Sequence, residues 1–276
     1  MGRVFRRVLA GVVGMSLVVP LLVPGVAAAK PARVVSTVSV LTYNMHHAAG
    51  VDGVVNLERI AGVISQSGAD VVGLQEVDVH FDARSNWEDQ AAWLANRLGM
   101  QYRFAANLDW DPTNPGEPRR QYGTAILSRY PIKDFSNTLL PLYAGSEQRG
   151  LAVATLDVGG RDLRFANTHL SKLTSAERVE QAQKVVQLLS GSTTPTVLIG
   201  DLNGVPTSPE IKTLTSVWKD TWPEVGLGLG YTNPSLFPTS RIDYVLHTST
   251  LTARTAKTPS TLASDHLPLL TTLNLP

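Results

Sequence analysis

Two kinds of apolar pattern alternate along the chain after residue 30. Short runs of apolar and β-branched side chains predict strands, whereas apolar residues that recur every three or four positions predict helices. The helical spacing occurs over residues 56–66, 87–98 and 175–189. Strand-like runs occur over residues 34–43, 70–77, 102–107, 122–128, 151–158, 163–170, 196–202, 241–247, 250–257 and 267–274. This alternation predicts one α/β domain over residues 30–276.

The middle of the chain is expected to form an antiparallel meander, because the strand-like runs between residues 102 and 170 follow one another without a helix. Gly159 and Gly160 mark a tight hairpin turn between two of them. Two long segments, residues 108–121 and 223–240, lack any periodicity. Long irregular loops in a compact domain are commonly functional, so we predict that these loops select the substrate.

The N-terminal segment has the order of features of a secretory signal peptide. Basic residues that include Arg6 and Arg7 precede an apolar run, and small residues end it at Ala29. We predict cleavage before Lys30 and a secreted protein, exported by either the general or the twin-arginine route. An uncleaved membrane anchor is the alternative, but Pro20 interrupts the run, and a spanning helix needs about 20 mostly apolar residues.

Charge and cysteine content narrow the function classes. The formal net charge of the whole chain is +1. The sequence therefore lacks the basic surplus that is typical of a dedicated nucleic-acid-binding protein. Cysteine is absent, which excludes disulfides and thiol catalysis. The hydrophobic core alone must stabilise the exported domain.

Polar residues stand at the carboxyl ends of several predicted strands, where α/β sheets bind their ligands. Asn44 and His46 share one face after the first strand, so His47 should point to the other face. We therefore expect the two adjacent histidines not to bind one metal together. Glu76 ends the next strand, and its carboxylate is a ligand suited to a hard cation. His169 ends a later strand, although a single histidine in such a place is more often structural.

The second half of the chain repeats this arrangement. Asp201 and Asn203 share a face directly after the apolar run TVLIG, although an ordinary turn would also explain them. Asp243 lies inside an apolar strand, where an unpaired carboxylate is strongly unfavourable, so it needs a partner. Asp265 and His266, in a bend before the final strand, supply a candidate. The joint occurrence of these signals predicts one catalytic pocket.

The chain resembles the endonuclease/exonuclease/phosphatase superfamily, which has the deoxyribonuclease-I-like fold. The resemblance lies in the ordered motifs TYNMHH, GLQEVD, YGTAILSRYPI, NTHLS, GDLNGVP, RIDYVL and SDHLPLL, which cover about residues 37–274. It implies a four-layer αββα sandwich, with two packed, mostly antiparallel sheets flanked by helices and the active site at their open end. It also implies Mg²⁺-dependent cleavage of phosphate esters, with Mn²⁺ as an alternative ion.

The resemblance also implies a role for each matching residue. The residues matched to the metal side of the family's site are Glu76, Asn44 and Asp265. The residues matched to water attack and phosphate binding are His169, Asp201, Asn203, Asp243 and His266. His46 stands where many nuclease members have an acidic residue, which argues against a second, more acidic metal subsite. We assign His46 to substrate binding, together with Arg149. For Arg149, a solvated surface position is the alternative.

These observations predict a secreted, metal-dependent phosphoesterase that acts on a phosphodiester or a phosphomonoester. Nucleic acid, a lipid headgroup such as that of sphingomyelin, and a small molecule all stay open as substrates, and no obligate protein partner is implied. For a lipid substrate, we expect the segment from Leu227 to Phe237 to contact the membrane. A catalytically silent binding scaffold is the alternative from another class, but it has no need of Asp201 together with the Asp243 and His266 pair.

Overall fold

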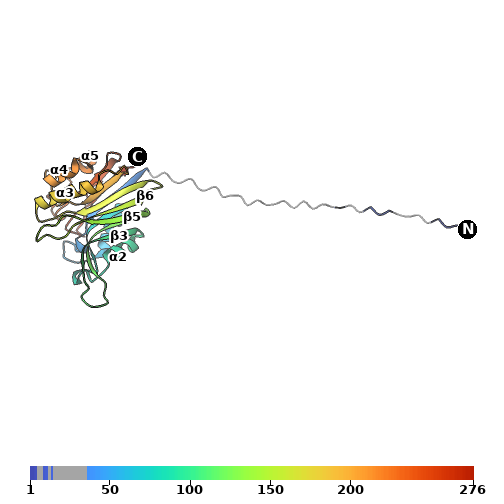
Figure 1. Cartoon of the computed structure of the whole chain (residues 1–276), viewed down its shortest axis with the longest axis horizontal. Coiled ribbons are helices and arrows are strands. Elements are labelled where there is room, and N and C mark those ends of the chain that lie inside the picture. The colour runs from blue at the N-terminus through green and yellow to red at the C-terminus, as the bar shows by residue number, and fades with distance from the viewer. Residues whose placement is uncertain (5–8, 12–13, 15–35) are drawn as a thin grey trace. The chain divides into compact units, whose positions relative to one another are not determined.

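The structure, a computed structural model, describes residues 1–4, 9–11, 14 and 36–276. The predicted signal peptide lies mostly outside the described residues, so its cleavage stays a prediction. Residues 36–276 form the folded domain shown in Figure 1. In the part of the chain that is described, no helix is both long and apolar enough to cross a bilayer.

Two six-stranded sheets form the centre of the domain. The first sheet has the order β11 (Thr252–Lys257), β12 (Leu269–Asn274), β1 (Thr37–Asn44), β2 (Val71–Val79), β4 (Arg120–Ser128) and β3 (Gln101–Trp110). The second has the order β5 (Ile132–Leu139), β6 (Gly150–Asp157), β7 (Asp162–His169), β8 (Thr196–Asp201), β10 (Asp243–His247) and β9 (Lys219–Asp220). Neighbouring strands are antiparallel, except that β1 pairs with β2 and β7 pairs with β8 in parallel.

Helices cover the outer faces of both sheets. They are α1 (Leu57–Ser67), α2 (Gln90–Leu98), α3 (Ser175–Leu189), α4 (Pro209–Thr215) and α5 (Thr221–Val225), with short 3-10 helices η1 (His46–Ala48) and η2 (Ala83–Ser85). Figure 1 shows α3 and α4 on one side of the strands and α2 on the other. Local signals fix the helix ends: the Asn56 side chain caps α1, Thr174 caps α3, and Gly99 ends α2 in the left-handed conformation.

Strand alternation divides the core into layers. Val197 and Ile199 of β8 pack between the sheets, and Leu198 packs against the helices on the outer face. Phe165 lies fully buried between the sheets, and Leu41 packs toward α1 and α2. The predicted four-layer αββα sandwich, with two mostly antiparallel sheets, is therefore confirmed.

Three expectations about local structure need correction. The predicted meander is divided: β3 and β4 pair in the first sheet, whereas β5, β6 and β7 form the meander of the second. Trp87 precedes α2 instead of lying on its face, because Asp89 caps that helix. The strands β3 and β4 extend into both ends of the predicted 108–121 loop and leave only residues 111–119 irregular. The pattern also missed β5, α4 and α5, which are short or partly exposed.

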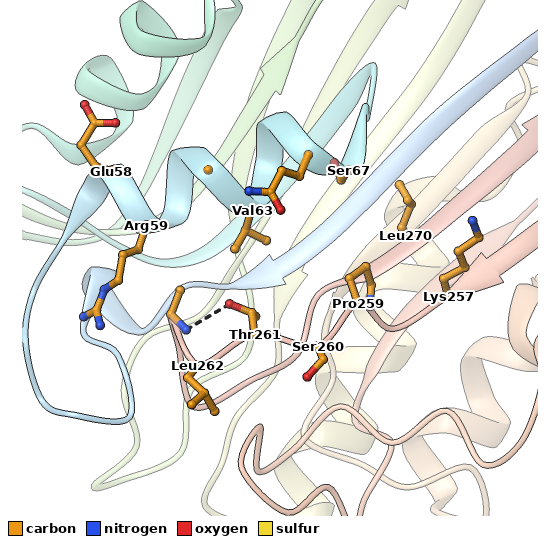
Figure 2. A pocket seen from close by; sticks show the side chains of 13 residues that line it. Glu58, Arg59, Val63, Ser67, Lys257, Pro259, Ser260, Thr261, Leu262 and Leu270 are labelled. Carbon is orange, nitrogen blue, oxygen red and sulfur yellow. Dashed lines mark hydrogen bonds between the residues drawn. The ribbon is translucent and has the colours of Figure 1, made fainter.

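A cavity of about 730 Å³ lies between α1 and the segment after β11 (Figure 2). Glu58, Arg59, Lys257 and Thr261 are among the residues that line it. None of the predicted site residues reaches this cavity. The chemistry must therefore be sought outside this cavity.

Candidate active site

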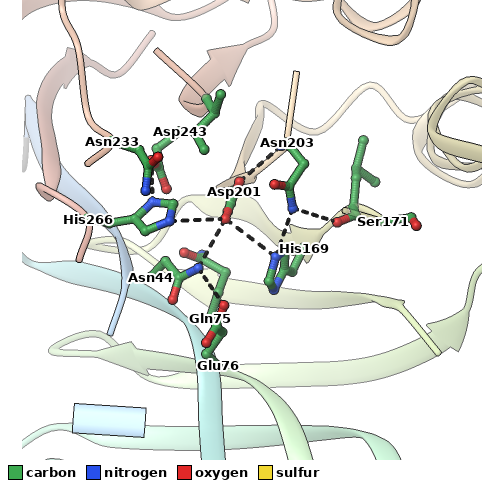
Figure 3. A network of polar contacts seen from close by, with 12 residues as sticks. Asn44, Gln75, Glu76, His169, Ser171, Asp201, Asn203, Asn233, Asp243 and His266 are labelled. Carbon is green, nitrogen blue, oxygen red and sulfur yellow. Dashed lines mark hydrogen bonds and ion pairs between the residues drawn. The ribbon is translucent and has the colours of Figure 1, made fainter. Parts of the chain in front are cut away.

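The two parallel strand pairs bring the predicted residues together, because carboxyl ends of parallel strands meet at one edge of a sheet. Asn44 is in register with Gln75 across β1 and β2, and His169 is in register with Asp201 across β7 and β8. Asp243 at the start of β10 lies opposite Asp201. Figure 3 shows the resulting cluster, to which both sheets contribute.

Asn44 connects the two halves of the cluster. Its Nδ2 donates to Glu76 Oε1 and to Asp201 Oδ2, each at 3.0 Å. Its Oδ1 accepts from the backbone N–H of His46 at 3.1 Å, which fixes the orientation of the amide. The amide nitrogen therefore faces the carboxylates. Asn44 thus bridges the two halves of the cluster, and the metal-side role that the resemblance implies for it stays a prediction.

Asp201 lies at the centre of the cluster and is only 2 % exposed. Its Oδ1 accepts from the backbone N–H of Asn203 at 2.9 Å, and its Oδ2 lies 3.4 Å from His169 Nε2 and 3.7 Å from His266 Nε2. Burial raises the pKa of Asp201 to about 7, although the His266 charge acts to lower it. A carboxylate with this pKa can accept a proton near neutral pH.

His169 is a neutral imidazole held between a cation and a carboxylate. Burial, with help from the Arg149 guanidinium, holds the pKa of His169 well below its usual range. Nδ1 lies 3.1 Å from Arg149 Nη1, which can only donate, so the ring proton is assigned to Nε2. Nε2 lies 3.4 Å from Asp201 Oδ2, which can accept its proton. Asn203 Nδ2 also lies 3.1 Å from Nε2, but it is itself a donor, and its hydrogen bond goes to the Leu170 carbonyl. His169 can therefore donate a hydrogen bond into the pocket without carrying charge.

Asp243 and His266 form a buried pair. His266 Nδ1 lies 2.9 Å from Asp243 Oδ2, so the structure supplies the partner that the buried carboxylate requires. Burial acts to lower the pKa of His266, but Asp243 and Asp201 together raise that pKa to about 10. His266 is therefore an imidazolium that presents a positive charge beside Asp201.

Glu76, Asp265 and two histidines lie at the outer part of the cluster. Asp265 Oδ1 lies 3.8 Å from His46 Nδ1 and 3.3 Å from Ser264 Oγ, and that hydroxyl donates to the Asn44 carbonyl at 2.7 Å. Glu76 and Asp265 are half-buried carboxylates, oxygen donors of the kind that suits a divalent cation, so the chemistry of these residue types fits the implied metal.

The expectation for the adjacent histidines is wrong. The chain leaves its extended conformation after Asn44, and the His46 and His47 rings lie 4.5 Å apart instead of on opposite faces. Each ring, together with Glu76, offers one ligand atom, and these atoms lie within 4.8 Å of one another. Burial and the Arg84 charge lower the pKa of His47, which favours its neutral form.

Arg149 is not a surface residue. It is 6 % exposed, and its guanidinium contacts Glu147 Oε1 at 2.6 Å as well as His169. The surface alternative is therefore excluded. The structure assigns Arg149 to holding His169, and any contact with substrate stays a prediction.

The predicted set of site residues omits one polar pair that joins the sheets. Gln75 Nε2 donates to Asn167 Oδ1 at 2.7 Å, and Asn167 Nδ2 donates to the carbonyls of Leu74 and Ala125 at 3.0 and 2.9 Å. Both side chains are fully buried and hydrogen-bonded. The sequence does carry a signal for this pair, because both are amide residues inside strands that are otherwise apolar. The pair fixes the relative position of the strands that carry Glu76 and His169.

A sandwich of two mixed sheets with such a polar cluster at one edge defines the deoxyribonuclease-I-like class of α/β proteins. The chain belongs to the endonuclease/exonuclease/phosphatase family, which residues 41–266 match. The resemblance seen in the motifs is thus confirmed at the level of the family.

Individual relatives support the same placement. The protein YbhP of Escherichia coli K12 is 28% identical over 159 residues, which cover 53% of this chain and 58% of YbhP. The chain thus spans little more than half of that relative. The structure of a family member from Beutenbergia cavernae is 28% identical, has a TM-score of 0.70, and is matched over 87% of this chain and 72% of that one. A mannosyl-6-phosphatase of Bacteroides thetaiotaomicron shares the fold, with 21% identity, a TM-score of 0.67, and coverage of 86% and 99%.

Proposed function

We propose that this protein is a secreted, divalent-metal-dependent phosphoesterase that hydrolyses a phosphodiester or a phosphomonoester by in-line attack of water. The observation that carries the proposal is the position of Asp201. Its buried carboxylate contacts Asn44 and lies beside one neutral and one charged imidazole. Family membership and the likeness to the phosphatase fold support the reaction class.

In this mechanism Asp201 accepts a proton from water as the water oxygen forms a bond to phosphorus. The ester P–O bond on the opposite side breaks, and the leaving oxygen is protonated by solvent. His169 and Asn203 donate hydrogen bonds to phosphoryl oxygens, and the His266 imidazolium stabilises the negative charge that develops there. Glu76 and Asp265 would hold the ion, with Mg²⁺ or Mn²⁺ expected from the resemblance. When bound, the ion supplies further positive charge to the phosphate.

The test is hydrolysis of bis(p-nitrophenyl) phosphate and p-nitrophenyl phosphate by the protein, with Mg²⁺, Mn²⁺ or a chelator. We expect metal-dependent turnover that the chelator abolishes. Asp201→Asn should lower turnover by about 10²- to 10⁴-fold, the usual effect of a lost general base. Asp134→Asn, on the exposed edge strand β5, is the matched control. Wild-type activity in Asp201→Asn would disprove the assignment of the base.

A lipid headgroup is a second candidate substrate, which one observation favours. A groove of about 460 Å³ adjoins the cluster, and its lining includes His46, Asp265, Pro234, Leu236 and Phe237. The Phe237 side chain is 75 % exposed. Apolar side chains that project beside a polar site can insert into a lipid surface.

Vesicle hydrolysis tests this candidate. Phe237→Ser should reduce cleavage of sphingomyelin in vesicles by about fivefold or more, because a membrane contact is lost. The same variant should cleave a soluble chromogenic ester at the wild-type rate. Val217→Ser is the control, since Val217 is also exposed but follows α4, outside the segment from Leu227 to Phe237. Equal losses on both substrates would exclude the membrane contact. Cleavage of DNA that falls steeply with added salt would indicate a nucleic-acid substrate instead.

Secretion is part of the proposal and is supported by the order of basic, apolar and small residues at the N-terminus. Sequencing the N-terminus of the exported protein tests it. The first residue should be Lys30, and a full-length, cell-bound product would contradict cleavage.

A further inference from the structure

The turn after β1 has an unusual backbone. His46, His47 and Ala48 have φ angles of 47°, 41° and 67°, so three consecutive residues with side chains occupy the left-handed region. Each such residue costs roughly 1–2 kcal/mol relative to ordinary backbone. The conformation places two imidazole rings side by side, in an edge-to-face contact with an interplanar angle of 67°.

The neighbouring strand has the same feature at Glu76. Its φ is 58°, and it lies where the pairing of β2 with β4 shifts between Leu74 and Val77. This bulge turns the Glu76 side chain toward the histidines. Left-handed residues are uncommon and concentrate where a side chain must be aimed at a functional point. Here the turn and the bulge aim three side chains at one point.

The distances suit a metal ion. One ligand atom from each of His46, His47 and Glu76 lies within 4.8 Å of the other two. Three nitrogen or oxygen ligands about 2.0–2.2 Å from one ion lie about 3–3.8 Å apart, so side chains separated by up to 4.8 Å must move together by roughly 1 Å to complete the set.

Neighbouring groups hold the three side chains in place. His46 Nδ1 lies 3.3 Å from the Ala49 carbonyl, the pattern in which a metal-binding imidazole uses its other nitrogen. Asn44 donates to Glu76, and Gln90 donates to the His47 carbonyl at 2.8 Å. Within the described residues, no hydrogen bond involves a ring nitrogen of His47. A ring nitrogen of His47 is therefore available to coordinate an ion.

We propose that His46, His47 and Glu76 form a site that binds a first-row transition dication, such as Zn²⁺ or Co²⁺, more tightly than Mg²⁺. Mg²⁺ prefers oxygen ligands and strict octahedral geometry, whereas imidazole nitrogen favours transition metals. Three protein ligands leave at least one coordination position open for a phosphate oxygen. The inference rests on the proposed metal dependence. It keeps Glu76 as a ligand of the proposed ion, adds the two imidazoles to it, and so names the class of ion that this chain selects.

Equilibrium metal binding tests the inference without any measurement of turnover. The protein is stripped with chelator, and Zn²⁺, Co²⁺ and Mg²⁺ are titrated separately by calorimetry. Visible absorption of the Co²⁺ complex reports nitrogen ligation. We expect Zn²⁺ and Co²⁺ to bind at least about 100-fold more tightly than Mg²⁺, as expected for a site with two imidazoles.

The variants His46→Gln and His47→Gln should each weaken Zn²⁺ binding by about 10-fold or more and change the Co²⁺ spectrum, since each removes a nitrogen ligand. His80→Gln is the matched control, because His80 lies outside the cluster and contacts the Trp87 carbonyl. Circular dichroism establishes that each variant is folded. Equal affinity for Zn²⁺ and Mg²⁺, or wild-type Zn²⁺ affinity in folded His47→Gln, overturns the inference.

The outcomes separate this inference from the proposed function. An enzyme that is active with Mg²⁺ but binds Zn²⁺ without His47 refutes the transition-metal site and leaves the phosphoesterase activity standing. A protein that binds Zn²⁺ through both histidines but hydrolyses no phosphate ester supports the site and refutes the activity.

Discussion

Replacement of Asp243 by asparagine tests the electrostatics of the pocket directly. The carboxylate lies 2.9 Å from His266 Nδ1 and is fully buried, so little solvent weakens the attraction. An opposite charge at this distance is worth about 1–3 pKa units. In wild type the pKa of His266 is raised to about 10. In Asp243→Asn, with Asp201 still 3.7 Å away, we expect the pKa of His266 to fall by about 2–3 units, which is about 3–4 kcal/mol less stabilisation of the imidazolium.

NMR titration of ¹⁵N-labelled histidine in the chelator-treated protein measures this change. The His266 resonance should titrate near pH 10 in wild type and in the Asp134→Asn control, and close to neutral pH in Asp243→Asn. Turnover of the chromogenic diester at pH 8 should fall by on the order of 10²-fold, since the imidazolium is both misoriented and partly deprotonated. A His266 pKa that stays near 10 in Asp243→Asn would refute the assignment of the pair.

Three further predictions concern stability, each measured by urea denaturation. The pKa of His169 is below its unfolded value near 6.5, so its contribution is complete above that pH and is lost as the pH falls. Between pH 6.5 and 5, the free energy of unfolding of the wild type should therefore fall by up to about 1.4 kcal/mol per pH unit more than that of His169→Gln. If the free energies of unfolding of the two proteins changed in parallel with pH, this prediction would be wrong. Gly200→Ala should destabilise by about 3 kcal/mol or more because its Cβ would lie 1.9 Å from the Thr168 carbonyl oxygen, whereas Gly62→Ala, in open space on α1, should stabilise by up to about 1 kcal/mol. Phe165→Ala should lower the free energy of unfolding by about 3–5 kcal/mol, because it leaves a cavity between the sheets. A loss under about 1 kcal/mol would mean that the sheets move together and fill that cavity.

Much of the fold could be predicted from local pattern. The span of α3 and the strand β8 agree with the periodicity, because their buried faces repeat at the spacing of a helix or a strand. The division of residues 102–170 between two sheets could not be predicted in this way. Alternation reports that a strand has a buried face, but it does not report which sheet covers that face.

The candidate site shows the same division. Asp201, Asp243 and His266 could be selected from the sequence, since a carboxylate or imidazole at the end of an apolar strand needs a partner and strand ends meet at one edge. Their contacts, at 2.9 and 3.7 Å, follow from the register of β8 and β10 and from the bend before β12.

The sequence by itself determined the layered α/β architecture and the residue types that gather at the strand ends. Only the tertiary structure decided that Arg149 is buried against His169, that the Asn44 amide faces two carboxylates, and that His46 and His47 converge on Glu76. The physical reason is that these features depend on groups distant in the chain and on left-handed backbone at a turn and a bulge. The side-chain period of an extended strand predicts the opposite arrangement for the two histidines, and tertiary contacts overrode it.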